Sequence, residues 1–134
     1  MSVLSENRKV YFNYEIIETF EAGIELRGFE VKSIKASRAN LTGAFATIKG
    51  DEIWLTNADI PPYQPKNTPA DYDPTRSRRL LLKKSEIKYL TGKMTSERLT
   101  VVPLKLYIKG GRIKVGLGLA RGKRKYEKRE TIKK

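Results

Sequence analysis

Residues 10–19 alternate between apolar and polar side chains. A period of two is the spacing of a half-buried β-strand, in which successive side chains point to opposite faces. The apolar positions of this pattern are Val10, Phe12, Tyr14 and Ile16. We therefore predict a strand over residues 10–19, which the sequence Glu21-Ala22-Gly23 interrupts.

After this interruption, the apolar residues are spaced as in a helix. Leu26, Phe29 and Ile34 can share one stripe, with Lys32 and Lys35 on the solvent side. This spacing predicts a helix near residues 22–36. A glycine at position 28, in the interior of that helix, would cost about 1 kcal/mol.

Two β-hairpins are predicted in the rest of the chain. Residues 44–48 and 53–55 flank Gly50-Asp51, and a glycine at the first turn position favours a type II′ turn. Residues 100–108 and 112–119 flank Gly110-Gly111. In this second hairpin, one face of each strand is expected to be apolar: Val102, Leu104, Leu106 and Ile108 in the first strand, and Ile113, Val115, Leu117 and Leu119 in the second. Gly116 and Gly118 then lie on the opposite face, where another segment can approach closely.

The remaining segments are short. Ser85 is a predicted helix N-cap, and Gly92 a predicted helix end. Four prolines make residues 61–69 a stiff, extended connection. Short strands, two hairpins and short helices in no βαβ order predict a mainly β protein, a small closed OB-like barrel with flanking helices. We expect the barrel to occupy residues 1–120 and a basic, disordered tail to occupy residues 121–134.

The chain is strongly basic. Its 134 residues include 28 Lys and Arg against 15 Asp and Glu, a net charge of +13, and residues 121–134 carry +6 of it. That segment has almost no apolar residues with which to fold alone. It is typical of a tail that binds a polyanion, most simply nucleic acid. The alternative is a solvated tail that only aids solubility.

Composition argues against other classes of protein. The chain has neither cysteine nor histidine, so it lacks thiolate and imidazole metal ligands and the commonest general base. Asp71 and Asp73 could hold magnesium in a nuclease, but surface acids are ordinary in such a loop. No apolar run is long enough to span a bilayer, and residues 1–9 lack the apolar core of a secretory signal. We expect a cytoplasmic protein that is not an enzyme and has no metal, cofactor, membrane partner or small-molecule substrate.

Several side chains are candidates for contact with RNA. Three basic groups add to the tail: Arg8-Lys9, Lys32-Lys35-Arg38 and Arg76-Arg78-Arg79-Lys83-Lys84. Asparagine amides can read base edges, and tyrosines can stack on bases or lie half-buried in strands; these residues are Asn7, Asn40, Tyr11, Tyr14, Tyr63 and Tyr107. Glu21 and Glu30 can accept hydrogen bonds from base amino groups or hold a neighbouring arginine.

Four segments, in the same order, resemble the family of small protein B, the SsrA-binding protein of bacterial trans-translation. They are residues 21–34 (EAGIELRGFEVKSI), 73–82 (DPTRSRRLLL), 100–107 (TVVPLKLY) and 122–130 (GKRKYEKRE). The resemblance covers residues 7–134. It implies an OB-like barrel that binds the tRNA-like domain of transfer-messenger RNA and accompanies it into stalled ribosomes.

The resemblance also implies site residues. The family's RNA-binding face falls on Asn7, Glu21, Lys32, Asn40, Leu81 and Lys123. Together with the basic and acidic neighbours noted above, the predicted RNA contacts further include Arg8, Lys9, Glu30, Lys35, Arg38, Lys83, Lys84, Arg121 and Arg124. The family's ribosome-directed tail falls on Tyr126, Glu127, Lys128 and Arg129. The sequence departs from the family at Glu127, where Asp is frequent, and at Lys83, where Asn or His is frequent.

Two other classes remain open from composition. A structural ribosomal protein would also be small, basic and free of cysteine, but it would copurify with its subunit at unit stoichiometry. A hydrolytic enzyme is disfavoured by the lack of histidine. An adaptor for transfer-messenger RNA would instead be substoichiometric to ribosomes and associate with one small RNA.

Overall fold

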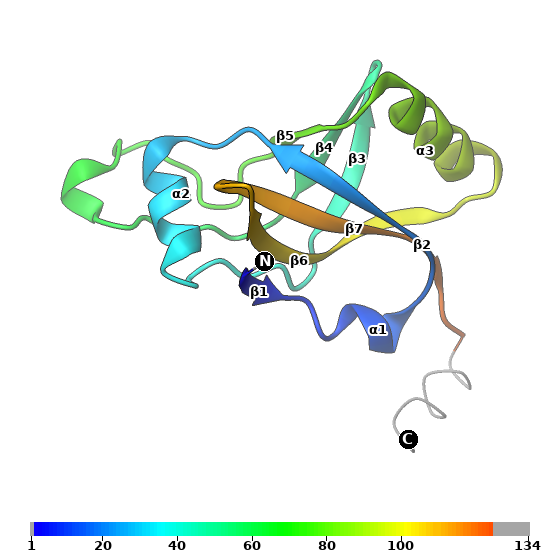
Figure 1. Ribbon diagram of the computed structural model, residues 1–134, viewed down its shortest axis with the longest axis horizontal. Coiled ribbons are helices and arrows are strands. Elements are labelled where there is room, and N and C mark those ends of the chain that lie inside the picture. The colour runs from blue at the N-terminus through cyan, green and yellow to red at the C-terminus, as the bar shows by residue number, and fades with distance from the viewer. Residues whose placement is uncertain (1, 125–134) are drawn as a thin grey trace.

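The computed structural model describes residues 2–124, which form seven strands, three α-helices and one 3₁₀ turn (Figure 1). Their bounds in chain order are β1 Ser2–Glu6, α1 Val10–Asn13, β2 Tyr14–Ile24, α2 Gly28–Lys35, β3 Phe45–Lys49, β4 Glu52–Thr56, η1 Pro65–Asn67, β5 Arg78–Leu81, α3 Lys84–Ser96, β6 Thr100–Lys109 and β7 Arg112–Gly122. Among these helices, none is both long and apolar enough to cross a membrane. A mainly β protein with short helices is confirmed.

The seven strands form one antiparallel sheet in the order β1-β6-β7-β2-β5-β4-β3. The prediction of a closed barrel is wrong, because β1 and β3 remain edge strands in the described part of the chain. β3 does come close to β6. However, β3 and β6 form no ladder among the described residues: β6 pairs with β7 along residues 100–109 and with β1 only at residues 105–108. The sheet therefore curls over a core without closing.

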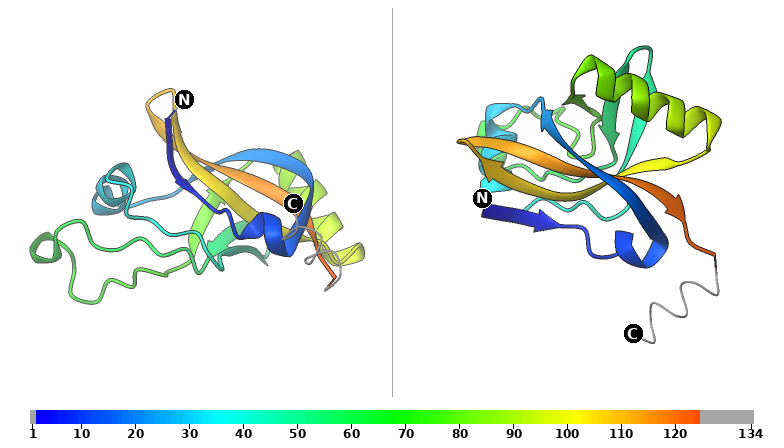
Figure 2. Two further views of the ribbon diagram at one scale, coloured as in Figure 1. Left: turned by 90° about the horizontal axis from the view of Figure 1, so that it is seen from below. Right: turned by 45° about the vertical axis from the view of Figure 1, so that its right-hand side comes forward.

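The helices and the long loop lie at different ends of this sheet. Figure 2 shows α2 beside the loop between β4 and β5 at one end, and α3 at the other. β7 ends next to α1, so the chain leaves the sheet beside its N-terminal segment (Figure 1). The sheet extends to Gly122, and the first two residues of the basic segment at 121–134 therefore belong to β7.

The predicted strand at residues 10–19 and helix at 22–36 both begin too early. Residues 10–13 form the helical turn α1, and β2 then continues through residues 21–23 to Ile24. Pairing with β7 explains the continuation, because it supplies backbone partners for all three of these residues. The helix α2 starts at Gly28, where the Glu30 carboxylate accepts a 2.7 Å hydrogen bond from the Arg27 N–H. Gly28 thus begins the helix and does not weaken its interior.

Both predicted hairpins are confirmed, but the single apolar face predicted for β6 is not. Gly50 has φ +62°, and Gly110 and Gly111 have φ +60° and +74°, as tight turns require. A β-bulge at Leu104 adds one residue to β6, which reverses the direction of every side chain beyond it. Val102 and Leu104 consequently pack in a small cluster outside the main core, whereas Leu106 packs inside it.

The other predictions for this region hold in part. The apolar face of β7 is confirmed, because residues 113, 115, 117 and 119 all lie in the main core. Gly118 faces the other way, and an added Cβ would lie 3.1 Å from Leu104 and 3.2 Å from Ile16. The helix predicted to begin at Ser85 and end at Gly92 begins at Lys84 and runs on to Ser96.

Glu30 lies at the centre of a buried ionic cluster that ties α2 to the loop before β5. Its side chain has no exposed surface, and neither has that of Arg78. The Glu30 carboxylate accepts hydrogen bonds from Arg78 Nε at 2.7 Å, from the Tyr72 hydroxyl at 3.0 Å and from Arg76 Nε at 3.1 Å. Arg78 also donates to the backbone carbonyls of Ala58, Pro74 and Arg76. The prediction that Glu30 contacts RNA is wrong, because it is enclosed by these partners.

These contacts determine how Glu30 titrates. Burial alone would raise its pKa, but the hydrogen bonds from Arg76, the Arg27 N–H and Arg78 outweigh it and lower the pKa from 4.5 to about 2. A lowered pKa in the folded state means that the carboxylate favours folding. This contribution is complete above about pH 4.5 and is lost as the pH falls through about 2.

We predict that Glu30→Gln lowers the free energy of unfolding by about 3–5 kcal/mol, because it leaves two arginines in the cluster without their counter-charge. Equilibrium denaturation in urea measures the change. The matched control is Glu25→Gln, which breaks the 2.9 Å ion pair of an exposed glutamate with Arg79 and should cost no more than about 1 kcal/mol. Equal effects of the two substitutions would show that the cluster is not a main source of stability.

Candidate nucleic-acid interface

Three of the predicted RNA contacts line one shallow hollow of about 400 Å³. They are Glu21 on β2, Leu81 on β5 and Lys83 just before α3. The charged part of its wall also includes Lys114 on β7, Arg79 on β5 and Glu86 on α3. These residues are far apart in the sequence, and the sheet brings them together because β2 pairs with β7 on one side and β5 on the other.

The pairing at Gly23 fixes the shape of this hollow. Gly23 lies opposite Leu81 in β5 and opposite Lys114 in β7. An added Cβ at Gly23 would lie 3.1 Å from the Leu81 Cβ, so the glycine permits this close approach. Leu81 is 45% exposed despite being apolar. An exposed leucine between cations and a carboxylate suits contact with a sugar or base face.

Glu21 is a fixed acceptor at the edge of the hollow. Its carboxylate accepts a 2.6 Å hydrogen bond from the Tyr107 hydroxyl and lies 3.3 Å from Lys109 Nζ. The bond from Tyr107 is the main cause that lowers the pKa of Glu21 below 4.5; partial burial opposes it, and Lys109 adds to it. Burial, and then the bond to Glu21, raise the pKa of Tyr107 above its usual value. Glu21 is therefore ionised at neutral pH and presents oxygen lone pairs to a ligand.

A second hollow of about 450 Å³ adjoins the first, with Gly23, Leu81 and Lys114 common to both. It adds Lys35 from α2 and Arg112 from β7. The two hollows form one basic surface across β5, β2 and β7 toward α2. Sequence reasoning missed Lys114 and Arg112. Lys114 could have been found from its position between two core residues of β7, had β2 been predicted to reach Ile24.

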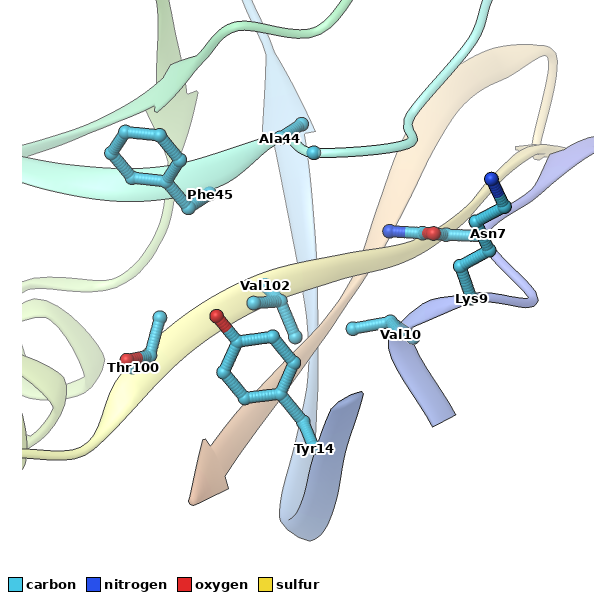
Figure 3. A pocket seen from close by; sticks show the side chains of 9 residues that line it. Asn7, Lys9, Val10, Tyr14, Ala44, Phe45, Thr100 and Val102 are labelled. Atoms are coloured by element: carbon cyan, nitrogen blue, oxygen red, sulfur yellow. The ribbon is translucent and has the colours of Figure 1, made fainter. Parts of the chain in front are cut away.

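Asn7 is buried in a different place. It is 4% exposed, and its side-chain NH₂ donates to the backbone carbonyls of Pro103 at 2.9 Å and Leu41 at 3.3 Å. Its Oδ1 has no hydrogen-bond partner among the described residues. Asn7 lines a pocket of about 260 Å³ with Lys9, Val10, Tyr14 and Phe45 among its walls (Figure 3). Only this oxygen is left for a ligand, so the main role of Asn7 is to join β1 to the segments around it.

Six further candidates, five basic residues and one asparagine, are spread over several surfaces. Lys32 is exposed on α2, Lys84 is exposed at the start of α3, and Arg8 is exposed near Glu6. Arg38 donates to the Tyr63 carbonyl at 3.0 Å, and the Asn40 side chain accepts from the Thr42 N–H at 2.9 Å. Arg121 pairs with Glu15 across β7 and β2. None of these six residues lines the hollow at Glu21.

The end of the described chain is held against α1. The Lys123 N–H donates to the Asn13 carbonyl at 2.8 Å, and Lys123 Nζ donates to the Tyr11 carbonyl at 2.9 Å. Arg124 follows and is exposed. The predicted ribosome-directed residues Tyr126, Glu127, Lys128 and Arg129 lie outside the described residues.

The two aspartates considered as magnesium ligands lie in the loop before β5. Asp73 accepts 2.9 Å hydrogen bonds from the Thr75 N–H and hydroxyl, which lower its pKa. Within residues 2–124, no three acidic side chains are grouped closely enough to hold a metal ion.

An open β-sheet with a net charge of +13 and a basic surface around a fixed carboxylate defines a small nucleic-acid-binding protein. Its family follows from comparison with known proteins. The profile described as "SmpB protein" matches residues 4–134, and the chain belongs to this family. The resemblance seen in the four sequence segments is therefore confirmed.

Individual relatives agree with this family. The chain is 53% identical to the SsrA-binding protein of Thermosynechococcus vestitus, over 99% of its own length and 88% of the relative's. It is 52% identical to the SsrA-binding protein of Synechococcus elongatus, over 98% and 85%. A solved chain described as "tmRNA-SmpB: a journey to the center of the bacterial ribosome" is 46% identical, with a TM-score of 0.75 over 98% of this chain and 95% of that one.

We predict that Tyr107→Phe raises the pKa of Glu21, because it removes the hydrogen bond that most stabilises the carboxylate. The pKa is measured from the carboxyl ¹³C chemical shift during a pH titration. The control is Tyr89→Phe, since the Tyr89 hydroxyl bonds to Glu18 on the same strand. A pKa of Glu21 that responds equally to both substitutions would contradict the assignment of Tyr107.

Proposed function

We propose that this protein is the RNA-binding adaptor of trans-translation, which binds the tRNA-like domain of transfer-messenger RNA and delivers it to stalled ribosomes. The observation that carries the proposal is the hollow in which Glu21, Leu81 and Lys83 meet, in a chain of the SmpB family. A structured RNA of this kind is recognised by its shape, by phosphate contacts and by the edges of unstacked bases. The surface around Glu21 supplies cations for phosphates, an apolar side chain for a sugar or base face, and a carboxylate for the edges of bases.

The side chains of the two hollows supply three kinds of contact in this proposal. Lys83, Lys114 and Lys35 neutralise phosphates, which accounts for most of the affinity and makes it dependent on salt. Leu81 packs on a ribose or base. Glu21 accepts hydrogen bonds from base amino groups, or from ribose hydroxyls, which gives the surface selectivity that cations alone lack.

The basic C-terminal segment serves a second partner in this proposal, ribosomal RNA. Its start is fixed, because Lys123 is hydrogen-bonded to the backbone of α1. Residues 125–134, which include the predicted Tyr126, Glu127, Lys128 and Arg129, begin directly after it. Binding of transfer-messenger RNA and engagement of the ribosome would thus use different parts of the chain.

We predict that Glu21→Ala weakens binding of the tRNA-like domain by roughly tenfold, the scale of one hydrogen bond to a charged group. The direction is informative, because removing a negative charge from a basic surface would strengthen a purely electrostatic interaction. Fluorescence anisotropy with a labelled tRNA-like domain measures the affinity, and a melting curve checks the fold. The matched control is Glu18→Ala, on the same strand. Unchanged or tighter binding by Glu21→Ala would refute direct contact.

Removal of residues 125–134 should separate the two activities. We expect the affinity for the isolated tRNA-like domain to fall by only a few-fold at physiological salt, because the hollow is intact. Peptide tagging on stalled ribosomes should be lost, because the ribosome-directed residues are absent. The control replaces the same ten residues with Gly and Ser. Tagging that survives the deletion would contradict this division, and so would a thousandfold loss of RNA affinity.

A further inference from the structure

A cleft of about 320 Å³ lies between α2 and the loop that follows β4. Its walls are Gly28, Phe29 and Lys32 on one side, and Tyr63, Gln64 and Asn67 on the other. It shares none of these residues with the hollows around Glu21. Two aromatic rings, a lysine and two amides are the groups that bind an unpaired nucleotide: the rings stack on a base, the cation holds a phosphate and the amides meet base edges.

Both aromatic walls are fixed before any ligand binds. Phe29 packs edge-on against Tyr72, with ring centroids 4.7 Å apart and an angle of 88° between the rings. Tyr72 is itself held by Glu30 and Arg78 in the buried cluster. Tyr63 is held by Arg38, whose guanidinium lies 5.2 Å from the ring centroid and donates to the Tyr63 carbonyl. A site whose walls are already ordered loses little conformational entropy on binding.

The cleft is open at Gly28. An added Cβ at this position meets no atom within 4 Å, although Gly28 is the first residue of a helix and has no positive φ. The backbone at this position therefore does not require glycine. A larger side chain can be placed there without a clash at its Cβ. α2 also connects the cleft to the other basic surface, since it carries Lys32 in the cleft and Lys35 in the hollow beside Leu81.

We propose that this cleft binds one unpaired nucleotide of the RNA, with the base against Phe29 and Tyr63 and its phosphate on Lys32. The proposal rests on the proposed function and extends it, because it places a base-stacking site at the far side of α2. An RNA bound at Glu21 would continue over Lys35 and α2 into the cleft.

The test uses the full chain and the isolated tRNA-like domain. Tyr63→Leu should weaken binding by roughly 5- to 150-fold, the effect of removing one base–aromatic stack. Tyr89→Leu, which alters an exposed tyrosine on α3, is the matched control and should change the affinity little. Gly28→Leu should weaken binding in the same way as Tyr63→Leu, by filling the cleft while both rings remain. Lys32→Gln should reduce the salt dependence, compared with Lys66→Gln on the neighbouring 3₁₀ turn.

Ring resonances of Phe and Tyr provide an independent readout. With ¹³C-labelled rings, Phe29 and Tyr63 should shift when the tRNA-like domain is added, as stacking on a base requires. The proposal is overturned if Tyr63→Leu and Gly28→Leu bind as tightly as Tyr89→Leu, or if these rings do not shift in the saturated complex. If Glu21→Ala still weakens binding in that case, the adaptor function stands and only the cleft is refuted.

Discussion

The fold at the α2 end of the sheet depends on one buried carboxylate. Glu30 accepts from Tyr72 and Arg76 in the loop before β5 and from Arg78 at the start of β5, so one carboxylate joins α2 to both. A carboxylate and two guanidinium groups are costly to bury, and the cost is offset only when their hydrogen bonds are satisfied together. Arg78 meets this condition by also binding three backbone carbonyls, which fixes the path of the loop.

The residues of the tight turns made part of the fold predictable from the sequence. Turn glycines at Gly50 and Gly110 identified both hairpins, since glycine readily adopts the positive φ of their turns. Pairing between distant strands was not predictable in the same way. Residues 21–23 look like a break, yet β7 holds them in an extended strand. The bulge at Leu104 reverses an alternation that looks continuous in the sequence, and the sheet stays open because β3 approaches β6 without pairing with it.

The candidate site was predictable to a similar extent. Glu21, Leu81 and Lys83 do meet, but family resemblance rather than spacing pointed to Glu21 and Leu81, because no local pattern links β2 with β5. Charge alone misassigned residues: Glu30 and Arg78 look like surface groups in the sequence and are fully buried. Lys114 was missed, because its place beside Gly23 depends on strand register. A buried charged residue is distinguished from an exposed one by the residues that pair with it in the fold. The sequence does not show this pairing.

The proposed function depends on the cations beside Glu21, which would bind the phosphates of the RNA. The most direct measurement is the salt dependence of affinity for the tRNA-like domain. Contacts with about six phosphates give a log–log slope of roughly −4 to −5. Lys114→Gln should make this slope shallower by about 1, whereas Lys49→Gln, whose lysine lies over Trp54 on the β3–β4 hairpin, should leave it unchanged. A wild-type slope near zero, or equal effects of the two substitutions, would contradict the claim.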